Sequence, residues 1–297
     1  MSTPTPNGIR DRASLRFGGR RGLRQRLGLV CLFSLVLGVG TLHAVSSLTV
    51  VTGGSAVANG GGGTVTISSF TVPSTGLPAG DTYLIVGISC HAGCSVNSVT
   101  WSGGSANAWA SLGTRADAGN TTMYIYQLQN PTAATNGSVV VNTSADKVVA
   151  GAMLLGGVHT GGPASAFRAF ASNVATSGTA TVTGVATNPG DMIIDVLAPH
   201  NDGACCDAPA TGQTAEWTVQ NGTTTTSAGD GGVFPVTSGT TATESWTLKA
   251  STDYAMGCIS VIPQSTSTPT TARPGQVVTG RLRPPGEAQP GAGSPRE

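Results

Sequence analysis

The sequence predicts an all-β protein, an antiparallel two-sheet β-sandwich of jelly-roll-like form. Short segments with alternating or wholly apolar residues recur between Gly, Asn, Pro and Asp residues, and none of them shows a helical period. The chain is rich in Gly, Thr, Ser, Ala and Val, and only 10% of it is charged, which is typical of an exported β-protein with Thr and Ser on its exposed strand positions. The roughly 220 residues between the two terminal segments suit one large sandwich.

The expected strands follow one another closely, and Met123–Leu128 is the clearest because its residue types favour β-structure. We expect strands near residues 64–72, 82–90, 97–101, 107–113, 122–129, 137–143, 147–157, 166–172, 178–184, 191–198, 214–220, 243–249 and 253–262. Gly-Asn at 119–120 and Asn-Gly at 136–137 and 221–222 predict turns between strands.

Residues 1–44 are interpreted as a signal peptide. Seven arginines precede the apolar run Leu27–Gly40, and Thr41–Ala44 ends on a small residue at which a peptidase can cut. The run is shorter than the ~20 residues that span a bilayer, although an uncleaved signal anchor remains an open alternative. We therefore predict an extracellular or cell-surface protein with no membrane contact after cleavage.

The charge balance argues against a nucleic-acid partner. Residues 1–44 hold seven of the 15 basic residues and one of the 14 acidic residues, so the remainder is mildly acidic, with Lys147 and Lys249 as its two lysines. The rest of the chain divides by composition into a flexible glycine-rich lead-in at 45–63, the sandwich at 64–264, and a disordered tail rich in Pro, Thr, Gly and Arg at 265–297.

A weak internal repeat suggests that the sandwich is built from two duplicated halves. A Gly-Asp turn leads into an apolar strand twice, and four residues match at an offset of 110: Gly80, Asp81, Leu84 and Val86 match Gly190, Asp191, Ile194 and Val196. Each strand runs into a cysteine-bearing loop, and a tryptophan follows, Trp109 or Trp217. The alternative is that unrelated β-strands reuse the same turn chemistry.

Several of these pieces resemble a module of unassigned function that recurs in bacterial secreted and phage-tail-type proteins. The pieces are the Gly-Asp strand at 80–88, Val99–Gly104, the Tyr124–Leu128 strand with Asn130-Pro131, Val149–Ala152, Gly156–Val158, Pro189–Asp191, and Gly212–Thr214 with Trp217. The resemblance covers about Gly80 to Pro263, implies a β-sandwich and supplies no catalytic residues. The cysteines at 90, 94, 205 and 206 and His91 depart from the pattern.

Two loops carry most of the reactive side chains, Cys90-His91-Ala-Gly-Cys94 and His200–Cys206. In an exported protein, Cys90, Cys94, Cys205 and Cys206 are disulfide candidates, and the three pairings stay open because bridges between the loops require both loops at one end of the sandwich. The alternative is a metal or redox site with His91 and His200 as further ligands. Cys258, inside an apolar strand, is expected to be a buried free thiol.

Other candidate residues are weaker. Asp195 interrupts the apolar strand 193–197; it could face solvent, pair with Arg168, or be catalytic in a polysaccharide-acting enzyme. Asp202, Asp207 and Asp230 lie in loops that could bind calcium, the one cofactor considered. The four tryptophans are expected in the core, with Trp101 the best candidate for an exposed sugar platform.

The preferred function is a non-catalytic module for binding, adhesion or structural assembly, with a glycan or cell-surface component as its partner. The binding candidates are His91, Trp101, His200, Asn201 and Asp202, because loops at the ends of a sandwich carry recognition. No catalytic or metal-binding residue is assigned. The open alternatives are the polysaccharide-acting enzyme and the metal or redox site.

Overall fold

β-Strands make up most of the structure. The computed structural model describes residues 44–45, 48–59, 63–91, 93–144, 147–200, 207–220 and 228–266. In chain order its strands are β1 (Ala44–Val45), β2 (Thr49–Asn59), β3 (Thr64–Val72), β4 (Asp81–His91), β5 (Val96–Trp101), β6 (Ala110–Asp117), β7 (Thr121–Gln129), β8 (Ala134–Thr143), β9 (Val148–Val158), β10 (Ala171–Ala186), β11 (Met192–Pro199), β12 (Ala208–Pro209), β13 (Thr214–Gln220), β14 (Ala228–Pro235), β15 (Thr241–Val261) and β16 (Ser265–Thr266). The described residues include one helical turn, α1 (Pro163–Ala166).

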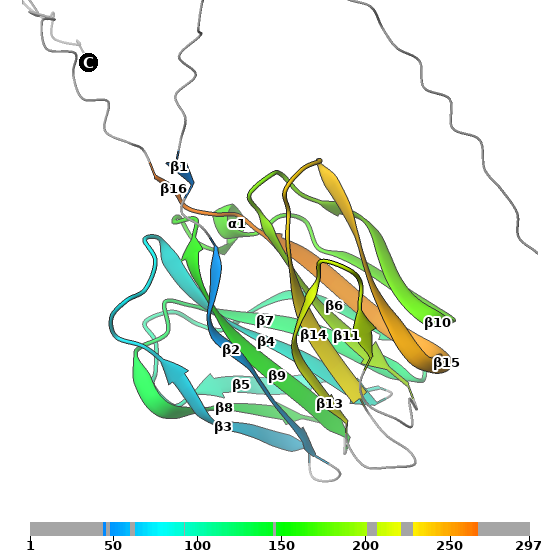
Figure 1. Ribbon diagram of the computed structural model, residues 1–297. Helices are drawn as coiled ribbons and strands as arrows, with labels where there is room; N and C mark the ends of the chain where they lie inside the picture. Colours follow the sequence, from blue (N-terminus) through cyan, green and yellow to red (C-terminus); the bar gives the residue numbers. More distant parts are fainter. Residues whose placement is uncertain are drawn as a thin grey trace, which may run out of the picture. The chain divides into compact units, whose positions relative to one another are not determined.

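Strands β2 to β9 form a jelly roll, here called the N-terminal roll (Figure 1). A five-stranded sheet of order β2-β9-β4-β7-β6 is covered on one face by a three-stranded sheet of order β3-β8-β5, and every pairing is antiparallel. Leu84, Val86 and Ile88 of β4 meet Val139 and Val141 of β8 between the two sheets. Alternate residues of β4 therefore fill the core of this roll, as the period of two in a strand requires.

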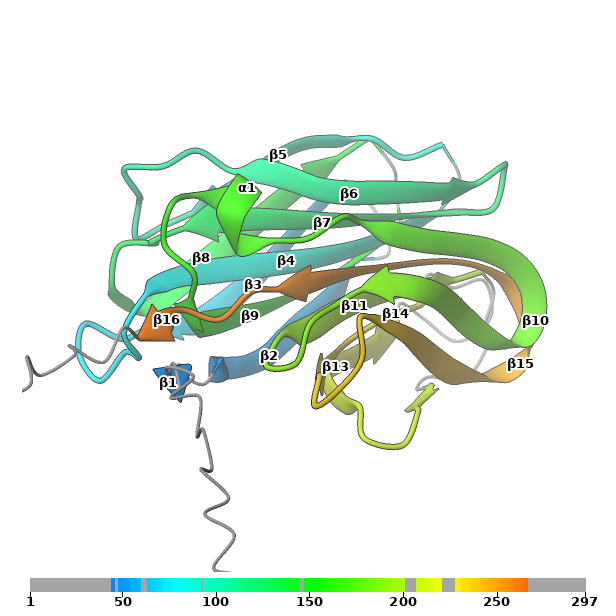
Figure 2. The same cartoon turned by 90° about the horizontal axis from the view of Figure 1, so that it is seen from above.

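Strands β10 to β15 repeat the same arrangement as the C-terminal roll. Its order is β10-β15-β11-β14-β13, with β12 also paired to β15. Residues 171–177 of β10 pair with 252–258 of β15, and residues 179–186 pair with 241–247 after a register shift. Figure 2 shows the two long strands curving round together. Thus β10 takes the places of β2 and β3, β15 takes those of β8 and β9, and the predicted repeat is present in the strand order.

The two rolls pack through the five-stranded sheet of one and the facing part of the six-stranded sheet of the other, so the predicted sandwich has more layers than two. One apolar core lies inside each roll, and a third lies between the five-stranded sheet and the facing sheet of the C-terminal roll. This third core includes Tyr83 and Ile85 of β4 and Ile194 and Val196 of β11. The all-β antiparallel sandwich is confirmed, and each half is itself a two-layer roll.

An approximate two-fold axis relates the rolls. Strand β2 contacts β13, and β10 contacts β6. Because β10 is the counterpart of β2 and β6 is the counterpart of β13, the two contacts are equivalent. A Cβ added at Gly87 would lie 2.6 Å from Val196, and four residues further along both strands His91 meets His200. The strands β4 and β11 therefore run in the same direction beside the axis, and residues 109 apart face each other across it, as in an isologous contact.

The sequence match at an offset of 110 does not align residues of the same environment. Leu84 and Val86 face the core of their own roll, whereas Ile194 and Val196 face the core between the rolls. A shift of one residue exchanges the two faces of a strand, so the structural offset of 109 places Leu84 in the position of Ile193. The tryptophans also differ, because Trp109 precedes β6 whereas Trp217 lies inside β13.

Trp217 fills the junction between the rolls over a surface made of glycines. A Cβ added at Gly151 would lie 2.1 Å from its Cδ2 atom, and one at Gly231 would lie 2.4 Å from its Nε1 atom. Gly87 and Gly229 approach the same ring, at 2.7 and 3.1 Å by the same measure. Real Cβ atoms essentially never come within 3.0 Å of another heavy atom, so glycine at 87, 151 and 231 creates the space that the indole occupies.

Several regions differ from the expected organisation. The segment 45–63, expected to be a flexible lead-in, contains β2 at the edge of the five-stranded sheet, and β16 includes the first two residues of the expected tail. Asn136-Gly137 lies within β8 at a register shift and makes no turn between strands, whereas residues 117–120 do form the expected turn between β6 and β7. The proposed signal up to residue 43 and the tail from 267 lie outside the described residues. Within the described part, no helix has the length and apolar character to cross a membrane.

Candidate functional site

His91 and His200 meet at one end of the junction between the rolls. Each is half-buried, one as the last residue of β4 and the other directly after β11, and their Nε2 atoms are 3.2 Å apart. The ring centroids are 5.1 Å apart with a 48° tilt, so nitrogen atoms converge and the ring faces do not stack. Burial, followed by the nearby His200 and Lys147, lowers the pKa of His91. The first histidine of each of the two segments singled out in the sequence is therefore brought to one place by the fold.

The cysteines beside this pair form a local bridge. Cys90 and Cys94 are joined by a disulfide with a sulfur–sulfur distance of 2.14 Å, which is one of the expected alternatives. A metal or redox site that uses their free thiols is thereby excluded. Cys205 and Cys206, together with the binding candidates Asn201 and Asp202, lie outside the described residues. Cys258 is a buried free thiol, as expected.

Trp101, expected to be an exposed platform, is buried. Its indole is 6% exposed, makes an edge contact with Phe70 and donates from Nε1 to the carbonyl oxygen of Thr132 at 3.0 Å. Its ring lies against Gly103 and Gly137, where a Cβ would come within 2.5 and 2.1 Å. Glycine at these two positions lets the chain fold closely over the indole.

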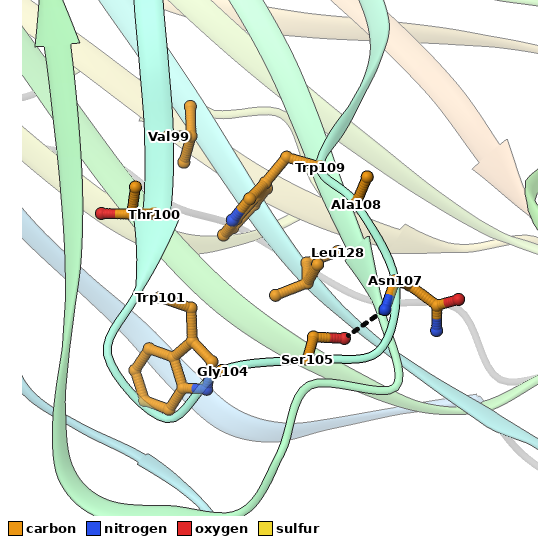
Figure 3. A pocket seen from close by; sticks show the side chains of 9 residues that line it. All are labelled: Val99, Thr100, Trp101, Gly104, Ser105, Asn107, Ala108, Trp109 and Leu128. Carbon is orange, nitrogen blue, oxygen red and sulfur yellow. Dashed lines mark hydrogen bonds between the residues drawn. The ribbon is translucent and has the colours of Figure 1, made fainter.

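The structure places a groove beside Trp101, at the loop between β5 and β6. Its volume is about 190 Å³, and it is lined by Val99, Thr100, Trp101, Gly104, Ser105, Asn107, Ala108, Trp109 and Leu128. Figure 3 shows the two indole rings and Leu128 around one hollow. Trp109 is half-buried, whereas the other three tryptophans are at most 6% exposed.

Hydrogen bonds hold the loop that forms the groove's rim. Asn107 donates from its backbone nitrogen to Ser105 Oγ at 3.0 Å and from Nδ2 to the carbonyl oxygen of Gln129 at 2.9 Å (Figure 3 shows the first of these bonds). Ser105 Oγ also donates to the Gln129 carbonyl at 3.2 Å. The loop is therefore fixed to β7 in a shape that keeps Trp109 at the edge of the groove.

Asp195 points into the core of the C-terminal roll and is inaccessible to substrate. It is 0% exposed, and its carboxylate accepts from Trp246 Nε1 at 2.8 Å and from Gln213 Nε2 at 2.7 Å. The expected partner Arg168 instead binds Asp191, with 2.5 Å between Nε and Oδ2. The catalytic role considered for Asp195 is therefore wrong, because a polysaccharide cannot reach it.

A second acid, Glu244, lies near Asp195 and was not singled out in the sequence. Burial raises the pKa of Asp195 to about 7, against the lowering effect of its hydrogen bonds, and burial together with the charge of Asp195 raises the pKa of Glu244 to about 8. The alternation of Glu244 with Trp246 and Leu248 in β15 is the signal that places Glu244 inside.

The calcium hypothesis gains no support from the loops that are described. Asp207 is 6% exposed and accepts from the backbone nitrogen of Lys249, while Asp230 is 1% exposed within β14. Over the described ranges, no three His, Cys, Asp or Glu side chains converge.

Comparison with known proteins identifies no relative. No family model matches the chain, and neither a curated protein nor a solved structure is found to be similar to it. The resemblance to a module of bacterial secreted and phage-tail-type proteins therefore stays a prediction, as do export and the extracellular location.

Proposed function

We propose that the chain is a non-catalytic binding module that holds a sugar residue of a glycan against Trp109. The observation that carries this proposal is the half-buried indole of Trp109 at the mouth of an apolar groove with a hydroxyl and amide rim. Adhesion or assembly at a cell surface would follow from binding such a ligand.

The lining of the groove matches the chemistry of a sugar ring. Aromatic faces pack against the apolar C–H face of a sugar, while Thr100, Ser105 and Asn107 can exchange hydrogen bonds with its hydroxyl groups. The volume of the groove, about 190 Å³, is smaller than the roughly 300–1,000 Å³ of drug-sized pockets. The groove therefore suits a single sugar residue better than several consecutive residues of a glycan.

The same lining favours binding over catalysis. Its nine residues include no carboxylate, imidazole, thiol or amine, so the groove offers stacking and hydrogen bonds but no general acid or base. Asp195 and Glu244 are buried in the C-terminal roll and do not line this groove.

The test is a binding screen against soluble glycans and insoluble polysaccharides, followed by titration calorimetry on any glycan that binds. Trp109→Ala should lower the affinity by about tenfold or more, since an aromatic contact contributes about 0.5–1.5 kcal/mol beyond its buried area. Trp109→Phe keeps a ring in place and should retain most of the affinity.

Thr66→Ala on the exposed face of β3 is the matched control, because it removes a surface side chain away from the groove. Circular dichroism confirms that each variant is folded. A screen without any binder, or a bound glycan whose affinity is the same for Trp109→Ala and wild type, would refute the proposal.

A further inference from the structure

We propose that His91 and His200 form a binding site for a borderline divalent transition-metal ion that joins the two rolls. The site is separate from the groove beside Trp101 and Trp109. Leu128 of the groove pairs with Leu84 near the start of β4, whereas His91 ends that strand.

The approach of the two imidazoles follows from the symmetry of the fold. His91 and His200 are 109 residues apart, the same offset that relates Gly87 to Val196, and both sit at the end of the axis between the rolls. Residues beside a two-fold axis meet their own counterparts, so the fold brings two equivalent side chains to one point.

Backbone hydrogen bonds hold each histidine to neighbouring residues of its own roll. The backbone nitrogen of His91 donates to the carbonyl oxygen of Lys147 at 3.2 Å, and that of His200 donates to the carbonyl oxygen of Asp253 at 2.7 Å. His91 also pairs with Thr121 in the ladder of β4 and β7, and Thr252 Oγ1 donates to the carbonyl oxygen of His200. The backbones at both positions are therefore held before any ion binds, which lowers the ordering cost of binding.

The distance between the nitrogens fits two ligands of one ion. Zinc–imidazole bonds of about 2.0–2.1 Å at tetrahedral angles place two ligand nitrogens about 3.3–3.4 Å apart. The observed distance of 3.2 Å between the two Nε2 atoms is close to this value, so only a small movement of the rings is needed for both nitrogens to bind one ion. Cys90 and Cys94 are oxidised and cannot ligate, so among the described residues the proposed site has the two imidazoles as its protein ligands.

Imidazole pairs prefer zinc, nickel and copper to magnesium and calcium, with copper(II) bound most tightly. The competing explanation of the 3.2 Å distance is an N–H···N hydrogen bond between a neutral donor and a neutral acceptor ring. That alternative predicts no response to metal, so the two explanations are separable by experiment.

The experiment uses the full chain, prepared without a histidine tag and without reductant, and titrated with zinc chloride. At about a hundredfold excess over the dissociation constant, the melting temperature should rise by roughly 5–11 °C, while magnesium and calcium leave it unchanged. His91→Ala and His200→Ala should each weaken zinc binding at least about tenfold. Loss of a residue that hydrogen-bonds to a metal ligand already lowers metal affinity by about 10–100-fold, and loss of the ligand itself should cost at least as much. His159→Ala, which removes a half-buried histidine elsewhere, is the matched control and should bind zinc like wild type.

Copper(II) electron paramagnetic resonance supplies an independent readout. Hyperfine lines from two imidazole nitrogens are expected in wild type, and from one nitrogen or none in either variant. Zinc binding that survives unchanged in both folded variants would overturn the site, and so would the absence of any metal-dependent shift in wild type. A shift lost in both variants but kept in His159→Ala establishes it.

Discussion

The glycine surface under Trp217 makes a quantitative prediction for Gly151→Ala. The new Cβ would lie 2.1 Å from Cδ2, 2.3 Å from Cε2 and 2.4 Å from Cγ of the indole, whereas carbon atoms in contact prefer about 3.5–4.0 Å. The ring and strand β9 must therefore separate by about 1.5 Å. Gly87, Gly229 and Gly231 approach the same ring closely, which restricts how far the indole can move.

Overpacking of this kind costs about 3 kcal/mol, at the upper end of the usual range, and should lower the melting temperature by roughly 6–12 °C for a domain of this size. Scanning calorimetry and urea denaturation measure both quantities. Gly178→Ala is the matched control: nothing lies within 4 Å of its added Cβ, so the same substitution should be neutral or stabilising by up to about 1 kcal/mol.

A double-mutant cycle isolates the contact. In the background of Trp217→Ala, the substitution Gly151→Ala should cost less than about 1 kcal/mol, which gives a coupling energy of about 2 kcal/mol between the two positions. The reasoning is refuted if Gly151→Ala is within about 0.5 kcal/mol of wild type, or if its cost is the same with and without the indole.

Two further predictions concern the buried acids and the disulfide. The folded-state pKa values of Asp195 and Glu244, about 7 and about 8, lie above those of the unfolded chain, so the unfolding free energy should decrease as the pH rises from about 4 to about 8. Asp195 alone contributes on the order of 4 kcal/mol to this decrease. Urea denaturation at several pH values should show a flatter pH dependence for the double variant Asp195→Asn with Glu244→Gln. A wild-type stability that rises over this range would contradict the burial of the pair. Replacing Cys90 and Cys94 together with alanine should cost about 2 kcal/mol, the entropy of closing so short a loop, and a loss of cooperative unfolding in the same titration would disagree with this estimate.

Strands with large side chains could be predicted from the sequence, and strands made of small residues could not. The expected strands at 64–72 and 214–220 coincide with β3 and β13 because their side chains show β-type composition and alternation. Strands β2 and β14 were missed because they are rich in glycine, which usually indicates a loop. In β14, Gly229 and Gly231 accommodate Trp217, a requirement set by another strand.

The site could be predicted in composition but not in geometry. His91 and His200 stand out as the histidines of two similar loops, yet their contact depends on β4 and β11 running in the same direction, which no local pattern specifies. Trp101 and Trp109 have similar surroundings in the sequence, and only the folding of residues 102–109 over β7 decides which ring stays partly exposed.

The pairing of β1 with β16 has a consequence for how the molecule is presented. The chain enters and leaves its described part through two adjacent segments, with Ala44 paired to Thr266. The backbone nitrogen of Gln264 donates to the carbonyl oxygen of Gly157, at the end of β9 that lies beside the start of β4. Any attachment through either segment would thus tether the protein at that same end. The histidines at the far ends of β4 and β11 would then lie at the opposite end of these strands from the tether.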